Sequence, residues 1–319
     1  MITTPAELRR VSERWRSAGL SLGLVPTMGA LHAGHRSLVR RARAECDRVL
    51  VTIFVNPAQF GPGEDLDRYP RPRERDLEVC AQEHADAVYA PRGGDVYPPG
   101  FATTVRVTGT LTSTLEGAAR PGHLDGVALV VAKLLAGSRA DRAYFGEKDA
   151  QQCALVRRLA SDLDLMTAIV PCATVRDEDG LALSSRNAYL SAGERAAALA
   201  IPRGLAAAAV HARAGVRDAR TLVAAVRAEI ERSDGVAVDY VAAVDGETFD
   251  AVDVLDAKSR IQVAARIGTT RLIDTLRPLV DEPPFTPARA RLEPGVATGA
   301  TGHPGLGPEE QQEPCAAPS

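Results

Sequence analysis

The sequence predicts an α/β protein in which a doubly wound parallel sheet is followed by a smaller α+β domain. Two observations carry this prediction. In the first half of the chain, short apolar runs with strand character alternate with segments whose apolar residues recur at helical spacing. Such alternation is typical of βαβ units, which build parallel sheets. In the second half, Ala- and Arg-rich helical segments are followed by strand-like runs, which indicates a separate, smaller layer.

The elements of the first half follow one another in a regular order. Helices are expected at residues 5–17, 35–46, 73–84, 123–138 and 148–163. Strands are expected at residues 20–25, 48–55, 86–91, 142–145 and 165–175. The run RVLVTIFV (48–55) is largely apolar, as expected for a strand covered on both faces.

The stretch RDEDGLALSSRN (176–187) interrupts this alternation, and we place a domain boundary at its start. The predicted domains are residues 1–175 and 176–280. In the second domain, helices are expected at 191–214 and 218–232, and strands at 236–245 and 260–268. From residue 281 to residue 319, Pro and Gly are frequent and no hydrophobic period remains, which predicts a disordered tail.

Composition excludes several classes of protein. The 319 residues suffice for two domains, and 45% apolar with 25% charged residues is an ordinary globular balance. A net charge of −3 and an aromatic content of 4% argue against a dedicated nucleic-acid binder. No apolar run is long enough to span a membrane, and the charged N-terminal stretch lacks a signal-peptide core. With five scattered cysteines and no Cys-x-x-Cys pair, we expect a cytoplasmic protein.

The most informative stretch is PTMGALHAGH (26–35), where the first strand turns into a helix. Ligands of doubly wound sheets bind beyond the carboxyl ends of the strands. Glycines allow the backbone to approach a ligand, and a helix N-terminus favours a phosphate. His32 and His35 are placed to donate hydrogen bonds to a phosphate in transfer. A plain strand–helix connector explains the turn equally well, whereas a zinc site fits poorly because the histidines are three residues apart.

Two further stretches stand out, and the first of them suits the hydroxyls and the carboxylate of a small substrate. FVNPAQFGPGEDLDRYPR (54–71) begins at an expected strand end, and its Asn56 and Gln59 offer uncharged amide donors and acceptors. LEGAARPGHLDGV (115–127) forms a small-residue turn before an expected helix and contains His123. An ordinary polar loop and an ordinary helix cap remain open for these two stretches.

Two other stretches suit a phosphate chain. YFGEKDAQQ (144–152) places Lys148 after a strand end, with Gln152 one helical turn further on. DGLALSSRNAYLS (179–191) contains two serines and Arg186, which can clamp phosphates. A capped helix and a polar hinge, with Ser191 as the cap of the next helix, are the alternatives.

Together and in this order, these stretches resemble the pantothenate synthetase (pantoate–β-alanine ligase) family, within the His-x-Gly-His nucleotidyltransferase superfamily. The similar family strings are F-V-N-P-x-Q-F, E-G-x-x-R-P-G-H-F-x-G-V, F-G-E-K-D-x-Q-Q and S-S-R-N. Two departures are Ala58, where the family often has Met, and Leu124, where it has Phe. The resemblance covers about residues 5–280 and implies a Rossmann-like domain that binds ATP and pantoate, followed by a C-terminal lid.

The resemblance implies ATP-dependent condensation of (R)-pantoate with β-alanine to pantothenate, through pantoyl-adenylate. His35, His32, Lys148 and Arg186 would be catalytic. The residues implied to contact ATP are Met28, Gly29, Ala30, Leu31, His32, Ala33, Gly34, His35, Gly146, Glu147, Lys148, Asp149, Val175, Leu183, Ser184, Ser185 and Arg186. Gln59, Gln152 and Asn56 would bind pantoate and β-alanine. Mg²⁺ would accompany ATP, its ligands are not assigned, and a homodimer is expected.

Two other functions remain open at this point. A nucleotidyltransferase that adenylates a phosphorylated small molecule would share the histidine turn but would have no need of the Asn56 and Gln59 loop. A non-catalytic nucleotide-binding module would have no need of the intact His32, His35, Lys148 and Arg186.

Overall fold

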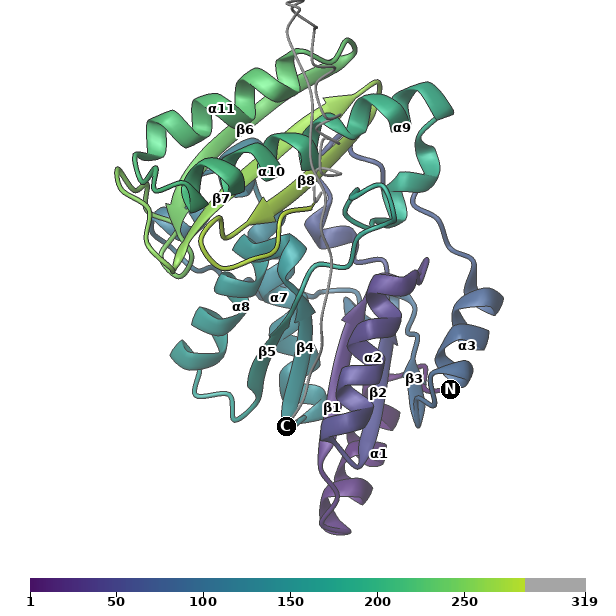
Figure 1. The fold of residues 1–319 in the computed structure, drawn as a ribbon. Coiled ribbons are helices and arrows are strands. Elements are labelled where there is room, and N and C mark those ends of the chain that lie inside the picture. The colour runs from purple at the N-terminus through teal and green to yellow at the C-terminus, as the bar shows by residue number, and fades with distance from the viewer. Residues whose placement is uncertain (285–319) are drawn as a thin grey trace, which may run out of the picture. The chain divides into compact units, whose positions relative to one another are not determined.

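The computed structural model describes residues 1–284, which belong to one compact unit. The tail that the sequence predicts from residue 281 therefore lies almost wholly outside the described residues. Within them, the chain builds two sheets, one parallel and one antiparallel (Figure 1).

The parallel sheet has five strands in the spatial order β3-β2-β1-β4-β5. Their bounds are β1 (Leu22–Thr27), β2 (Arg48–Ile53), β3 (Ala87–Tyr89), β4 (Arg142–Gly146) and β5 (Ala168–Cys172). All four neighbouring pairs are parallel. The chain runs outward from β1 to β3, returns to the centre and continues through β4 to β5. The order reverses between β1 and β4, which is where such sheets bind ligands.

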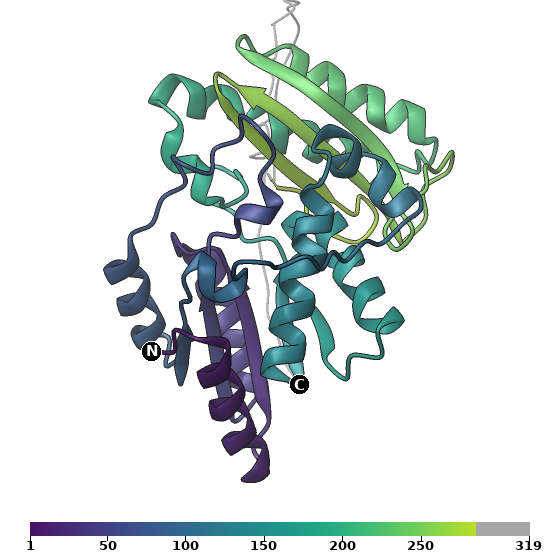
Figure 2. The same cartoon turned by 180° about the vertical axis from the view of Figure 1, so that it is seen from behind.

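Helices cover both faces of this sheet (Figures 1 and 2). Their bounds are α1 (Pro5–Ser17), α2 (Ala33–Glu45), α3 (Arg73–Gln82), α7 (His123–Ser138) and α8 (Ala150–Asp162). Alternate strand residues enter two cores: Leu22, Leu24 and Leu50 pack on the side of α1 and α7, whereas Val25 and Val51 pack on the side of α2 and α3. The doubly wound, Rossmann-like sheet is therefore confirmed.

The antiparallel sheet consists of β6 (Val236–Asp245), β7 (Ser259–Ile267) and β8 (Thr270–Leu276), in that order. Three helices precede it: α9 (Ala192–Ala198), α10 (Ala200–Arg213) and α11 (Ala219–Glu231). Leu205, Leu222 and Ile261 belong to the apolar core between these helices and the strands. The smaller α+β layer is confirmed. The boundary at 175/176 stays a prediction, because the described residues form one unit.

Several expected elements differ in detail. The strand expected at 165–175 is limited to β5, and the helix expected at 191–214 is divided into α9 and α10. Strand β8 and three short helices were not expected; these helices are α4 (Gly93–Val96), α5 (Thr110–Ser113) and α6 (Glu116–Ala119). The remaining elements are the 3-10 turns η1 (Pro57–Gln59), η2 (Glu147–Asp149) and η3 (Ser185–Tyr189). Among the described helices, none combines the length and the hydrophobicity that crossing a lipid bilayer requires.

Candidate active site

A cavity of about 220 Å³ lies beyond the carboxyl ends of β1 and β4. The predicted site residues that line it are Met28, His32, Gly34, His35, Asn56, Gln59, Gly146, Lys148, Asp149, Gln152, Val175, Leu183, Ser184, Ser185 and Arg186. The predicted ATP contacts Gly29, Ala30, Leu31, Ala33 and Glu147 belong to the same turns but do not line the cavity. Four separate stretches of the sequence thus meet at one place.

The two histidines cap the N-terminus of α2. His32 is the N-cap, and its Nδ1 accepts a hydrogen bond from the backbone N–H of Gly34 at 3.2 Å. The Nδ1 of His35 accepts one from the backbone N–H of His32 at 3.3 Å, and the ring centroids are 4.1 Å apart. In a neutral imidazole that accepts through Nδ1, the proton resides on Nε2.

The surroundings keep both imidazoles uncharged. Burial, followed by the charge of Lys148, lowers the pKa of His32 to about 4. Burial, with His32 and Lys148 adding to it, lowers the pKa of His35 to about 3. Both rings line the cavity, so they are neutral hydrogen-bond donors at neutral pH rather than imidazolium ions.

A buried carboxylate holds the turn between β1 and α2. Asp76, on α3, is 1% exposed and accepts hydrogen bonds from the backbone N–H groups of Ala30 and Leu31, at 2.8 and 2.7 Å. Gly29 has φ +84°, and a Cβ there would lie 2.9 Å from Asp76 Oδ2. The turn therefore requires a glycine and depends on a residue that is 46 positions away from Ala30.

The amide pair forms part of the opposite wall. Asn56 Nδ2 donates to Gln59 Oε1 at 3.0 Å and to Gly126 O at 3.1 Å, while its own oxygen accepts from Tyr97 at 2.8 Å. Asn56 is thus satisfied within the protein and fixes the orientation of the Gln59 amide. The loop is pressed against α7, because a Cβ on Gly126 would lie 2.1 Å from Ala58 O.

The third side of the cavity is formed by η2, which contains Lys148. The side chain of Lys148 is 16% exposed, and its Nζ lies 3.8 Å from Asp149 Oδ2. Gln152 follows in the first turn of α8. Glu147 points elsewhere and forms an ion pair with Arg260 of β7.

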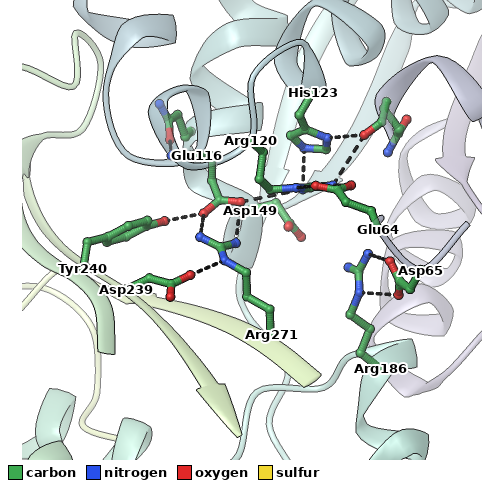
Figure 3. Close-up of polar contacts among 12 residues, drawn as sticks. Glu64, Asp65, Glu116, Arg120, His123, Asp149, Arg186, Asp239, Tyr240 and Arg271 are labelled. Carbon is green, nitrogen blue, oxygen red and sulfur yellow. Dashed lines mark hydrogen bonds and ion pairs between the residues drawn. The ribbon is translucent and has the colours of Figure 1, made fainter. Parts of the chain in front are cut away.

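The segment 183–186, which lines the remaining side of the cavity, contacts the histidine turn directly. Ser185 donates through Oγ to the backbone oxygen of Ala30 at 3.2 Å, and Ser184 caps η3 by accepting from Arg186 N. Arg186 donates from Nε and Nη2 to the two oxygens of Asp65, both at 2.9 Å (Figure 3). Leu183 is tied to Val175 by a backbone hydrogen bond of 3.0 Å.

A second arginine lines the cavity and was not among the predicted site residues. Arg120 donates from Nε and Nη2 to the two carboxylate oxygens of Glu64, both at 2.7 Å (Figure 3). Its Nη1 donates to His123 Nε2 at 2.9 Å, and His123 Nδ1 donates to the backbone oxygen of Gln59 at 2.8 Å. Burial, followed by the charge of Arg120, lowers the pKa of His123 to about 4.

Two kinds of signal explain what the sequence did not reveal. Arg120 stands within the quoted stretch LEGAARPGHLDGV, so a basic residue in a Gly- and Pro-rich turn was a usable signal. Asp76 carries no local signal, because its partners lie on another segment and its own helix resembles a charged surface helix.

Comparisons with known proteins agree with this arrangement. The family model described as pantoate-beta-alanine ligase matches residues 1–277. The chain belongs to this family. The pantoate–β-alanine ligase resemblance inferred from the motifs is therefore confirmed, as is the expectation that the chain is a ligase of this family.

Individual members of the pantoate–β-alanine ligase family are closely similar. The pantothenate synthetase of Rubrobacter xylanophilus is 51% identical over 281 residues, which cover 86% of this chain and 97% of that protein. The crystal structure of the pantothenate synthetase from Thermus thermophilus is 45% identical, with a TM-score of 0.82 over 87% of this chain and 98% of that chain. A pantoate–β-alanine ligase from Francisella tularensis, complexed with β-γ ATP and β-alanine, is 31% identical, with a TM-score of 0.71 over the same shares.

Proposed function

We propose that this cavity carries out the ATP-dependent condensation of (R)-pantoate with β-alanine to pantothenate, with release of AMP and pyrophosphate. One observation carries the proposal: the two neutral histidines of the turn after β1, three basic side chains and the amides of Gln59 and Gln152 line a single cavity at the switch point of the sheet. These are the groups that activation of a carboxylate by ATP requires. Curated relatives that match about 85% of this chain at about 50% identity bear the name pantothenate synthetase.

The chemistry divides into two steps. A carboxylate is a poor acyl donor, because its leaving group would be an oxide ion. In the first step, an oxygen of the pantoate carboxylate attacks the α-phosphorus of ATP, which gives pantoyl-adenylate and pyrophosphate. In the second step, the β-alanine amine attacks the activated carbonyl carbon, AMP leaves and the amine loses a proton. The protein contributes positioning and charge stabilisation rather than a covalent nucleophile.

The first step is assigned to the histidine turn and the two phosphate-binding cations. The Nε2–H groups of His32 and His35 donate to oxygens of the phosphate under attack, and the positive end of the α2 dipole favours the same charge. Lys148 and Arg186 bind the phosphates that become pyrophosphate. The family resemblance implies further contacts with ATP. They lie in the turns after β1 and β4, at Val175 and in the segment 183–185.

The amides are assigned to pantoate. Gln59 has its oxygen occupied by Asn56, and its Nε2 contacts only the sulfur of Met28, a weak acceptor, at 3.3 Å, so Nε2–H is the group offered to the acid. Gln152 faces the same cavity from α8. Asn56 contributes by orienting Gln59, since the protein already satisfies its polar atoms.

Mg²⁺ is proposed to enter with ATP. Among the described residues, no group of three or more His, Cys, Asp or Glu side chains is arranged to hold a metal ion. Mg²⁺ keeps several waters and is usually held by phosphates and one or two carboxylates, which fits a cavity containing Asp149. The ion neutralises charge on the triphosphate.

From the family resemblance we also propose that the protein is a cytoplasmic homodimer. Light scattering of the purified protein tests its dimeric state.

Isotope exchange tests the proposal. With ATP, pantoate and labelled pyrophosphate, and without β-alanine, label should enter ATP, and adding β-alanine should yield pantothenate and AMP. Exchange that requires a phosphorylated substrate instead of pantoate would favour a nucleotidyltransferase. If ATP binds and nothing is released, the chain is a non-catalytic binding module.

A further inference from the structure

Three basic side chains line the cavity within the described residues: Arg120, Lys148 and Arg186. The proposed function uses Lys148 and Arg186 at the phosphates and leaves Arg120 without a role. Of the three substrates, β-alanine carries a carboxylate that is not consumed in the reaction. This carboxylate has to enter a partly buried pocket, where an unpaired charge is costly. A role for Arg120 in binding it rests on the proposed function, because that function names β-alanine as a substrate.

Arg120 already binds a carboxylate in the geometry that such a substrate needs. Its Nε and Nη2 donate in parallel to both oxygens of Glu64, each at 2.7 Å. This two-point contact is the strongest and most directional way in which a guanidinium group holds a carboxylate. The side chain of Arg120 is 14% exposed and lines the cavity, so its guanidinium group is not part of the outer surface.

The position of Arg120 links it to the proposed acid subsite. Its third donor, Nη1, contacts His123, and His123 in turn holds the backbone oxygen of Gln59. A carboxylate on Arg120 therefore lies next to the residue assigned to pantoate. An amino acid that bound there by its carboxylate would have its amine free to reach the neighbouring acyl group.

The two acidic neighbours of Arg120 differ in how firmly they are held. Glu116 lies 3.7 Å from Arg120 but is bound by both terminal nitrogens of Arg271 and by the hydroxyl of Tyr240 (Figure 3). Burial opposes its charge, yet Arg271 lowers the pKa of Glu116 to about 2. Glu64 belongs to the loop after η1, and among the described residues its one ion-pair partner is Arg120. Glu64 is thus the exchangeable partner, and Glu116 the fixed one.

We propose that Arg120 binds the carboxylate of β-alanine, and that Glu64 occupies the same two donors when the amino acid is not bound. Burial would raise the pKa of Glu64, but the hydrogen bonds and charge of Arg120 lower it, so the residue competes as an anion. The separation of Arg120 from the acyl site then selects an amino acid of fixed length. Binding exchanges one ion pair for another and leaves no cation unpaired.

A pair of acceptors tests the carboxylate assignment. β-Alanine and its neutral amide carry the same amine on the same chain, but only the acid carries the charge. With Arg120→Met, we expect kcat/KM for β-alanine to fall roughly 30- to 100-fold, and kcat/KM for the amide to change about threefold or less. Arg120→Lys should restore part of the preference for the acid, because it returns the charge without the two-point geometry. Equal losses for acid and amide would overturn the proposal and leave Arg120 as a support for Gln59.

The competing carboxylate provides an independent test. Glu64→Gln should lower the KM for β-alanine several-fold, because the uncharged glutamine side chain no longer competes with the substrate carboxylate for Arg120. The KM for the neutral amide of β-alanine should stay the same. Asp67→Asn, an exposed residue of the same loop, is the matched control. An unchanged or higher KM for β-alanine in Glu64→Gln contradicts the exchange. Pantoate-dependent pyrophosphate exchange in the wild type separates failure of the proposed function from failure of this inference. If the wild type shows no exchange, the proposed function is refuted. If it shows exchange, but Arg120→Met loses kcat/KM equally for β-alanine and for its amide, only this inference is refuted.

Discussion

The Nδ1 atom of His35 accepts the backbone N–H of His32, so the two histidines of the turn are connected through the main chain as well as by the contact of their rings. This bond fixes which nitrogen of His35 carries the proton. The proton is thereby placed on Nε2 of a ring that lines the cavity.

A neutral His35 predicts a flat pH profile for the first step. An imidazolium donor with the ordinary pKa of 6.5 would lose activity about tenfold per unit at higher pH, whereas a group with pKa about 3 does not titrate there. Between pH 6.5 and 8.5, pantoate-dependent pyrophosphate exchange should therefore vary by about twofold at most. His35→Ala should lower the exchange rate about 10²- to 10³-fold, and the exposed His211→Ala should leave it unchanged. A tenfold decline per pH unit above 6.5 would contradict the neutral donor.

Removing the carboxylate of Asp76 should disturb the nucleotide turn from outside the cavity. Asp76→Ala leaves the N–H groups of Ala30 and Leu31 without an acceptor, at a cost of roughly 1–3 kcal/mol. The melting temperature should fall, and the ATP dissociation constant from calorimetry should rise about tenfold. Glu78→Ala, on the exposed face of the same helix, is the control. Unchanged ATP affinity in a folded Asp76→Ala protein would show that the turn keeps its shape without this support.

The buried His123 predicts a loss of stability in mild acid. Its pKa is about 4 in the folded protein and about 6.5 in the unfolded chain, so the unfolded chain binds the extra proton between these values. Unfolding is therefore favoured as the pH falls below 6.5, by roughly 2 kcal/mol at pH 5. His123→Gln keeps a donor for Gln59 and does not titrate. The decrease in melting temperature from pH 7 to pH 5 should be smaller in His123→Gln than in the wild type or in His211→Gln; an equal decrease in all three would refute this assignment.

The ion pair of Arg176 with Asp274 should be important for stability. Asp274 is 2% exposed and accepts from both terminal nitrogens of Arg176, at 2.6 and 2.9 Å. Asp274→Ala leaves a cation that is largely buried, and should lower the free energy of unfolding by about 3–5 kcal/mol in urea titrations. The double variant Arg176→Met/Asp274→Leu should lose much less free energy of unfolding, because it leaves no buried charge without a partner. Glu231→Ala, which removes an exposed pair with Arg227, should cost less than about 1 kcal/mol.

That same pair explains why the last strand was not found in the sequence. The run of β8 contains Arg271 and Asp274 between its apolar residues, which obscures any alternation. Each charge has its partner on a distant segment: Glu116 for Arg271, and Arg176 for Asp274. A charged side chain can be buried only if an oppositely charged partner is buried with it. Here the two partners are separated by about 100 residues or more along the chain, so the local sequence does not reveal them.

The parallel sheet was predictable for the opposite reason. Its strands are apolar and short, and the helices between them show regular spacing, so local pattern and final burial agree. The histidine turn, η2 and η3 were found because Gly, His, Lys and Ser stand together in short stretches. The neutral state of the histidines was not predictable, since it results from burial and from Lys148, which lies on another strand end.

The contact between Gly126 and Ala58 sets one dimension of the pocket in backbone atoms. No side chain fits between α7 and the loop that carries Gln59, because even a methyl group on Gly126 would overlap the Ala58 oxygen. Substitution at this junction cannot adjust the separation of the two walls by small increments. Variants selected for bulkier acids should instead change the width of the pocket through lining side chains such as Val130 and Leu134. The enzyme thus has one inflexible axis and one adaptable axis for substrate size.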